Sequence, residues 1–348
     1  MKIVFINDTF SIGRGVDTVI YELAKRLGKK HKVVVVTTNS EFKEKNFRIK
    51  KIKASKLFTG TWRDFLFPIN ALKFRKSLKK EIYDVANLHH ATLFLGLIGL
   101  PNIIVTYHGS PPAYGNFIFK LGRNFINFLG KICLRFATKV ITISHYLKNE
   151  LIKFGVPKNK IIVIPNAVDE DFKPTWEDEN YMLFVGRLEK HKRVNELIKL
   201  AKEINFPLKI VGVGPEKGNL IALAKKLNSP VKFLYKVNKK MLIQLYQKCS
   251  FFVSASKWEG FGLVFLEANA CGKAIVGYNC TAIKERIINN VNGFKVKNYE
   301  ELIKICKRLK ENKNLRKKVG MNGYIQTKKY NWNDIGEKYE EVFKMSIS

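Results

Sequence analysis

Short apolar runs alternate with helix-period segments along almost the whole chain, and this alternation constrains the fold more than any other feature. In the first half, strands are predicted at residues 3–6, 33–37, 84–88, 103–107 and 140–143. Helices are predicted between them at residues 18–27, 70–81 and 117–137, and from residue 144 onward. Strict alternation of this kind requires parallel strands joined by crossover helices, so the sequence predicts a doubly wound α/β domain.

The alternation stops once and then restarts. Residues 170–180 are polar and acidic and contain Pro174, which is typical of a linker. Beyond them, strands are predicted at residues 182–185, 208–211, 231–234, 251–254 and 274–276, and helices at 302–319 and 333–345. We therefore predict two domains of the same class, residues 1–166 and 167–325, followed by a helical segment at residues 326–348.

The amino-acid composition indicates which binding partners and which cellular compartment to expect. The net charge is +34, which favours anionic partners such as a nucleotide, a phospholipid surface or a nucleic acid. Alternatively, lysines spread over solvent-exposed faces would give the same net charge. The longest apolar stretch, residues 91–100, is about half as long as a bilayer-spanning helix requires. Scattered cysteines and the lack of a signal-peptide pattern predict a reduced, cytoplasmic protein without a transmembrane helix.

Two carboxylates, Glu259 and Glu267, flank a glycine-bearing turn. Glu267 falls one turn inside a predicted helix, whereas Glu259 stays in the loop. Carboxylates can bind the hydroxyl groups of a ribose and of a sugar, and N–H groups at the helix start can bind a diphosphate. The pattern favours a loop closed over a nucleotide-linked sugar, and a glutamate that only compensates the helix dipole is the alternative. The residues between the two acids that would line this loop are Gly260, Phe261, Gly262 and Leu263.

Three other turns follow predicted strands, where ligands bind in open α/β sheets. In the first turn, Gly15 lets backbone N–H groups approach an anion, although the G-x-G-x-x-G fingerprint is missing. In the second, Arg187 and Lys192 can neutralise phosphate oxygens. The third contains Gly214 at a strand exit. Tight turns and a basic surface loop explain the same residues, so no single turn decides the function.

In this order, the motifs resemble the retaining glycosyltransferases of family 4, which have the GT-B architecture. The resemblance covers nearly the whole chain and is carried by the Gly15 turn, by residues 106–109 and 163–169, by Arg187 with Lys192, and by an E-x7-E motif from Glu259 to Glu267. It implies two Rossmann-like doubly wound domains facing a central cleft. The first domain would bind the acceptor, the second would bind the nucleotide-sugar, and the final helix would cross back to the first domain.

The resemblance also implies roles for individual residues. Arg187 and Lys192 would neutralise the diphosphate leaving group, Glu267 would bind the ribose, and Glu259 would bind the donor sugar. His108 would touch the sugar near the reacting carbon. Base contacts would be made largely by the backbone near Tyr235. The family transfers with retention, uses no metal, and needs no cofactor besides its nucleotide-sugar co-substrate and a hydroxyl acceptor.

Four positions depart from the family pattern. The glycine pair before Glu285 is Thr281-Ala282 here, which leaves the donor-sugar contacts of that loop open. The glycine after the clamp lysine is Arg193, Ala167 follows the hinge residue Asn166, and Arg14 replaces one glycine of the first turn. None of these changes removes a charged group that the chemistry needs.

Other functions stay open at this point. A nucleotide-sugar epimerase on the same architecture and a non-enzymatic polyanion-binding protein are the alternatives, and no sequence-specific nucleic acid is expected. The D-x-D pattern at residues 169–171 lies in the apparent linker, so we do not interpret it as a metal site. Two segments mix basic with aromatic side chains. One is residues 73–80 with the preceding Trp62, Phe65 and Phe67, and the other is residues 117–136. They predict either ordinary amphipathic helices or a peripheral patch for an anionic membrane, with a lipid-linked acceptor.

Overall fold

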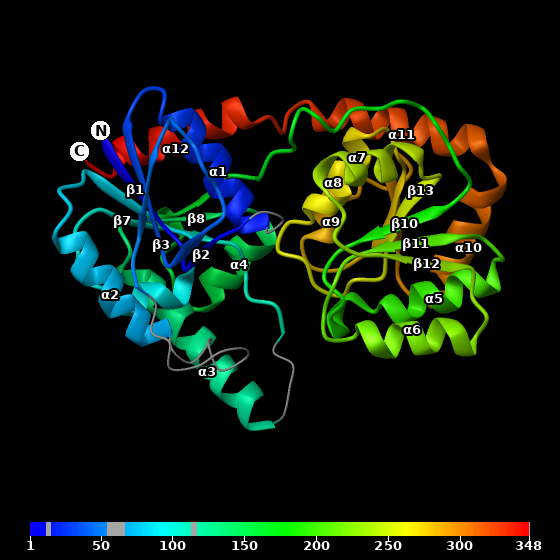
Figure 1. Ribbon diagram of the computed structural model, residues 1–348, viewed down its shortest axis with the longest axis horizontal. Helices are drawn as coiled ribbons and strands as arrows, with labels where there is room; N and C mark the ends of the chain where they lie inside the picture. The colour runs from blue at the N-terminus through cyan, green and yellow to red at the C-terminus, as the bar shows by residue number, and fades with distance from the viewer. Residues whose placement is uncertain (12–14, 54–66, 113–116, 348) are drawn as a thin grey trace. The chain divides into compact units, whose positions relative to one another are not determined.

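The computed structural model describes residues 1–11, 15–53, 67–112 and 117–347. The chain forms two compact units, each with its own sheet (Figure 1). Unit 1 comprises Met1–Asn166 together with Trp332–Ser348, and unit 2 comprises Ala167–Asn331. The prediction for Trp62 and Phe65 falls outside the described residues, as do the side chains of residues 67–70 and 117–119.

Unit 1 is built on a parallel seven-stranded sheet with the order β5-β3-β1-β6-β7-β8-β9. Its strands are β1 (Lys2–Ile6), β3 (Lys32–Thr37), β5 (Arg48–Lys51), β6 (Val85–Leu88), β7 (Ile103–Tyr107), β8 (Lys139–Thr142) and β9 (Ile161–Val163). A separate pair is formed by β2 (Thr9–Phe10) and β4 (Asn39–Ser40). The helices are α1 (Gly15–Leu27), α2 (Phe67–Lys79), α3 (Phe117–Cys133), α4 (His145–Lys153), α12 (Trp332–Met345) and the short 3-10 turns η2 (Ala91–Gly96), η3 (Leu134–Phe136) and η4 (Lys158–Lys160).

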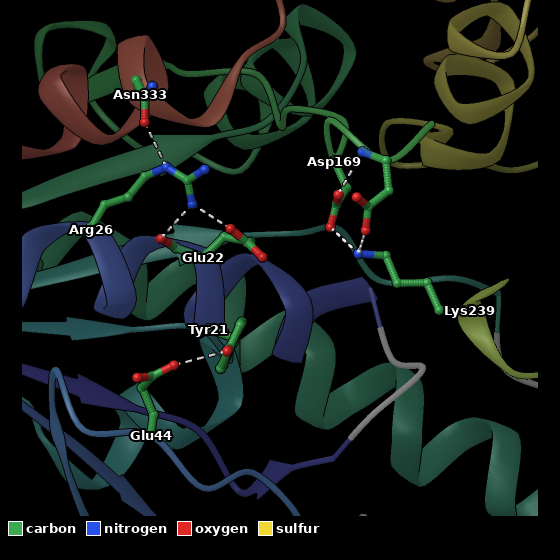
Figure 2. Close-up of polar contacts among 8 residues, drawn as sticks. Tyr21, Glu22, Arg26, Glu44, Asp169, Lys239 and Asn333 are labelled. Atoms are coloured by element: carbon green, nitrogen blue, oxygen red, sulfur yellow. Dashed lines mark hydrogen bonds and ion pairs between the residues drawn. The ribbon is translucent and has the colours of Figure 1, made fainter. Parts of the chain in front are cut away.

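The last helix completes the core of unit 1. Helix α12 lies along α1, where Arg26 Nε donates to Asn333 Oδ1 at 2.9 Å (Figure 2). On its inner side, Phe343 is fully buried and its ring centre lies 6.1 Å from that of Phe5 in β1. Helix α12 therefore belongs to the same hydrophobic core as the first strand, although more than 300 residues separate them in the chain.

Unit 2 has a parallel six-stranded sheet with the order β12-β11-β10-β13-β14-β15. Its strands are β10 (Met182–Val185), β11 (Leu208–Val211), β12 (Val231–Leu234), β13 (Phe251–Ser254), β14 (Ile275–Tyr278) and β15 (Gly293–Val296). Its helices are α5 (Val194–Glu203), α6 (Lys217–Lys226), α7 (Lys239–Lys248), α8 (Leu263–Ala270), α9 (Ile283–Arg286), α10 (Tyr299–Glu311), α11 (Lys313–Thr327) and the 3-10 turn η5 (Lys190–Lys192). Both sheets confirm the predicted doubly wound α/β class.

Helices cover both faces of the unit 2 sheet, so its strands are apolar on both sides. Met182 and Phe184 pack into one core cluster with α5, α6 and α10, whereas Leu183 between them packs into the other cluster with α7 and α8. Phe251 and Phe252 divide in the same way. This alternation follows from the two-residue period of a strand and explains why the strands appear in the sequence as continuous apolar runs.

Two sequence predictions differ from the structure, and one edge strand was not predicted. Residues 302–319 are not one helix, because Asn312 ends α10 and its side chain accepts from Leu315 N–H to cap α11. The predicted linker is fixed to unit 2, where Arg316 donates to Asp178 Oδ2 through Nε at 3.1 Å and Nη2 at 2.7 Å. Strand β5 was not predicted, since an edge strand made of Arg and Lys around one Ile has no apolar run. Within the described ranges, no helix is long and apolar enough to cross a membrane.

Candidate functional site

The strand order of unit 2 reverses between β10 and β13, which are neighbours in the sheet. Successive strands run outward from β10 toward β12 on one side and from β13 toward β15 on the other. In open α/β sheets, ligands bind outside the carboxyl ends of the strands at such a switch point. The loops that leave β10 and β13 carry Lys192 and Glu259, so the topology brings these two side chains to one place.

Lys192 and Glu259 form an ion pair across this switch point. Lys192 Nζ lies 2.6 Å from Glu259 Oε1, and the two side chains are only 15% and 12% exposed. The backbone of Glu259 is also fixed, because its N–H donates to Thr281 Oγ1 at 3.1 Å and its carbonyl accepts from Ala282 N–H at 3.3 Å. Thr281 has φ +46°, a conformation that glycine adopts more easily.

Arg187 lies on the same loop as Lys192 but does not join the ion pair. Its side chain is 64% exposed, and its Nε donates to Glu189 Oε1 at 2.7 Å. Glu189, which holds the guanidinium beside the loop, was not predicted from the sequence. Arg193, where the family has glycine, adopts the left-handed φ of +48° and pairs with Glu196. The backbone at position 193 thus keeps the shape expected of a glycine although an arginine stands there.

Glu267 lies in α8, one turn beyond Gly262, whose φ of +82° lets the helix begin directly after the loop. The hydroxyl of Tyr246 in α7 donates to Glu267 Oε2 at 2.8 Å. Burial raises the pKa of Glu267 to about 7, the nearby charge of Asp169 adds to that rise, and the hydrogen bond from Tyr246 opposes it. Tyr246 was not predicted as a site residue. It is a fully buried core residue, and its side-chain hydroxyl donates to Glu267.

The loop between the two glutamates has a fixed shape. Phe261 is buried, and the guanidinium of Arg286 lies 4.4 Å from the centre of its ring. The same guanidinium lies 4.9 Å from the ring centre of Tyr330. Gly260 and Leu263 complete the segment, and Leu263 begins α8. These contacts preorganise the backbone N–H groups at the start of α8, which is the arrangement that anion binding at a helix N-terminus requires.

The D-x-D pattern is occupied by a lysine. Lys239 Nζ lies 2.6 Å from an oxygen of Asp169 and 2.6 Å from an oxygen of Asp171 (Figure 2). Hydrogen bonding to Lys239 holds the pKa of Asp171 below its usual value. The pair of aspartates therefore fastens the start of unit 2 to the beginning of α7. In the parts of the chain that the structure describes, no three His, Cys, Asp or Glu side chains are grouped to hold a metal ion.

Gly214 and Tyr235 follow β11 and β12. A Cβ atom on Gly214 would lie 2.4 Å from the carbonyl oxygen of Leu188, so close packing of the strand exits already requires glycine there. Tyr235 lies at the edge of the sheet, with Lys217 Nζ 3.7 Å from its ring centre. Its hydroxyl is buried without a hydrogen-bond partner among the described residues, and burial raises its pKa. Neither residue lies at the β10/β13 switch point itself.

In unit 1, the strand order reverses between β1 and β6, and two histidines follow β6 and its neighbour β7. His89 Nδ1 and His108 Nε2 are 2.9 Å apart. Burial, with a smaller contribution from His90, lowers the pKa of His108 to about 3, and burial also lowers the pKa of His89. Both rings are therefore neutral at physiological pH. The contact between His89 and His108 was not predicted from the sequence.

Gly15 is the first residue of α1, beside the carboxyl end of β1. The buried carboxylate of Asp17 in α1 accepts from Asn7 Nδ2 at 2.6 Å and from Ser11 N–H at 2.8 Å. Asp17 was not predicted, because an acid in the first turn of a helix looks like ordinary dipole compensation. In the structure, Asp17 also fixes Asn7 and Ser11, which follow β1 in the chain.

The comparisons with known proteins decide the family. Residues 138–326 match the family described as glycosyl transferases group 1, and residues 13–172 match Glycosyltransferase Family 4. The chain is 30% identical to an uncharacterized glycosyltransferase of Methanocaldococcus jannaschii, over 98% of this chain and 99% of that protein. The chain belongs to the family 4 glycosyltransferases. This assignment confirms the resemblance on which the GT-B prediction rested.

Other relatives of this glycosyltransferase agree in class and in fold. An N,N'-diacetylbacillosaminyl-diphospho-undecaprenol alpha-1,3-N-acetylgalactosaminyltransferase of Campylobacter jejuni is 28% identical over 65% of each chain. Among solved structures, sucrose-phosphate synthase from Thermosynechococcus elongatus has a TM-score of 0.85 at 19% identity, covering 99% of this chain and 98% of that one. Anabaena HepE in complex with UDP-glucose has a TM-score of 0.80 at 18% identity, over 99% of this chain and all of that one. These structures show the GT-B fold.

Proposed function

We propose that this glycosyltransferase transfers a hexose-like sugar from a nucleoside-diphosphate sugar to a hydroxyl acceptor, with retention and without a metal. Unit 2 would bind the donor and unit 1 the acceptor. The observation that carries the proposal is the Lys192–Glu259 pair at the switch point of unit 2, 2.6 Å apart, with a second glutamate, Glu267, in the helix α8 that follows the same loop. A cation and two carboxylates match the diphosphate, the sugar and the ribose of one ligand.

The reaction breaks the bond between the anomeric carbon and the diphosphate and forms a bond from that carbon to the acceptor oxygen. The acceptor hydroxyl loses its proton in this step, and an oxygen of the leaving diphosphate can accept it. Negative charge develops on the leaving diphosphate, where Lys192 and the N–H groups at the start of α8 would stabilise it. Arg187 would add its charge by leaving Glu189, which its exposed position allows. Glu259 would bind sugar hydroxyls, and Glu267 would bind the ribose. Neutral His108 would contact the sugar or the acceptor by hydrogen bonding rather than by charge.

The names of relatives suggest the first substrates to test. One HepE complex contains UDP-glucose, and the name of the Campylobacter enzyme gives an undecaprenol-linked sugar diphosphate as its acceptor. We therefore infer a UDP-sugar as the first donor to test, and a polyprenol-linked or glycan hydroxyl as the acceptor.

The direct test measures acceptor-dependent release of nucleoside diphosphate from UDP-, GDP- and ADP-sugars in the presence of a chelator. The proposal predicts release with one nucleotide class, loss of release in Lys192→Met, and a product whose anomeric configuration equals that of the donor by NMR. Chelator-sensitive release or an inverted product would contradict the mechanism. Epimerised donor without acceptor would favour the epimerase, and salt-dependent anion binding that survives Lys192→Met, without any turnover, would favour the polyanion-binding alternative.

A further inference from the structure

We propose that the outward face of α3 docks on an anionic lipid bilayer. Leu121, Phe125 and Phe128 follow one another at spacings of four and three residues, so they form one row along the helix. Their side chains are 54%, 61% and 47% exposed, although all three are apolar. Helix α3 is labelled in Figure 1. The proposal concerns binding to a surface and does not depend on the reaction assigned to unit 2.

The opposite side of α3 is the one that packs on the protein. Gly130 faces η2, where an added Cβ would lie 3.3 Å from the methyl group of Thr92. The helix therefore already has a buried side. Of the exposed row, Phe128 also contacts unit 1, since its ring centre lies 6.0 Å from that of Phe154. Beyond the end of α3, Phe136 in η3 is 62% exposed as well. Neighbouring apolar side chains left in water on a folded unit mark an interaction site.

The charge of this part of unit 1 indicates what kind of surface would bind. Residues 85–168 contain a single acid, Glu150, and nine basic residues: Lys120, Arg123, Lys131, Arg135, Lys139, Lys148, Lys153, Lys158 and Lys160. Glu150 pairs with Lys131 and accepts a hydrogen bond from Tyr107 at 3.0 Å, so it does not oppose an anionic partner. An apolar row in a strongly basic region matches a bilayer that carries anionic headgroups.

A second copy of the chain fits this face less well than a bilayer does. Two α3 faces brought together would place the same basic residues opposite each other, and like charges at close range disfavour association. A bilayer offers anionic headgroups to the lysines and arginines and an apolar interior to the phenylalanines. The row from Leu121 to Phe128 spans about 10 Å at 1.5 Å per residue, which is long enough to lie in the plane of the interface.

The test is co-sedimentation of the full chain with vesicles of phosphatidylcholine alone and of phosphatidylcholine containing about 30% phosphatidylglycerol, at about 0.1 M salt. We expect binding to the anionic vesicles only. The double variant Leu121→Ser/Phe125→Ser should bind at least tenfold more weakly, since each side chain loses the transfer free energy of a half-exposed apolar group. Lys120→Gln should weaken binding about fivefold, as expected for one basic residue at an anionic surface.

Unit 2 offers a matched control. Ile325 is 54% exposed, the same fraction as Leu121, and Ile325→Ser should leave vesicle binding unchanged. Equal thermal midpoints would show that the exposed substitutions leave the fold intact. Wild-type protein that ignores anionic vesicles overturns the proposal. Binding that the double variant retains in full, binding to phosphatidylcholine alone at the same strength, or a dimer that disappears in the double variant overturns it as well.

Discussion

Replacing Glu259 by glutamine removes the negative charge from the Lys192 ion pair while it keeps the size of the side chain. Lys192 Nζ lies 2.6 Å from the Glu259 carboxylate, so a bound diphosphate must share this lysine with Glu259. Without the carboxylate, the lysine is free to meet the diphosphate. We therefore expect Glu259→Gln to bind the nucleoside diphosphate more tightly than the wild type, while it turns over more slowly.

The size of the effect follows from Coulomb's law. A phosphate that contacts Lys192 would lie roughly 6 Å from the Glu259 carboxylate, and at an effective dielectric constant of about 20 to 40 the repulsion is about 1–3 kcal/mol. Removing it should tighten nucleoside-diphosphate binding by roughly five- to a hundredfold. Turnover should fall on the order of a hundredfold, because a glutamine lacks the charge that we assign to contact with the donor sugar in the transition state.

Calorimetric titration with the nucleoside diphosphate measures the first effect, and steady-state transfer measures the second. Lys192→Met is the matched control, and it should weaken nucleotide binding because it leaves Glu259 as an unpaired carboxylate near the phosphate position. The double variant should recover part of that loss. Unchanged or weaker nucleotide binding in Glu259→Gln, with the fold intact by circular dichroism, would contradict the assignment of Lys192 to the diphosphate.

Three further predictions concern single sites. The pKa of Glu267 is raised to about 7, so nucleotide affinity of the wild type should fall as the pH is lowered from 8 to 6, whereas Glu267→Gln should show no such change in titrations. Because the folded pKa exceeds the unfolded one, this group also loses stabilisation as pH rises from about 4.5 through 7, and Glu267→Gln should remove that slope from urea unfolding curves. Gly214→Ala should lower the unfolding free energy of unit 2 by more than about 2 kcal/mol in denaturant titrations, because the Cβ of the alanine would meet the Leu188 carbonyl. A variant as stable as the wild type would contradict this packing role. His89 Nε2 is buried without a partner among the described residues, so the proton of His89 belongs on Nδ1, which donates it to His108 Nε2. The proton of His108 then lies on its own Nδ1. Nitrogen NMR should find it there in the wild type and in His89→Asn, and should find a mixture of tautomers in His89→Leu.

The sequence predicts the fold well because the signals of a doubly wound sheet are local. An apolar run such as residues 182–185 and the amphipathic helix that follows it can be identified without knowing their partners. Asn312 shows the limit of this reasoning, since a cap that splits one helical pattern into two depends on a single side chain. The same holds for residues 170–180, whose polarity suggests a linker but whose Asp178 meets Arg316 far along the chain.

The candidate site was only partly predictable. Its charged groups stand in motifs, so Lys192, Glu259 and Glu267 could be named from the sequence. Their partners could not be named, because Tyr246 lies 21 residues from Glu267 and on another helix, and nothing in its neighbourhood marks it. The 67-residue separation of Lys192 and Glu259 is bridged only once the strand order is known. Pairings of this kind are set by topology rather than by local pattern.

We infer that the switch point of unit 2 binds a nucleoside diphosphate through Lys192, Glu259 and Glu267. Thermal unfolding with saturating UDP, GDP or ADP, in the presence of a chelator, tests it most directly. A ligand at about a hundred times its dissociation constant stabilises the folded state by about 2.7 kcal/mol, which raises the melting temperature of a domain of this size by roughly 5–10 °C. The account predicts such a shift with one of the three nucleotides and its loss in Lys192→Met. No shift with any of them, or an equal shift in the variant, would contradict it.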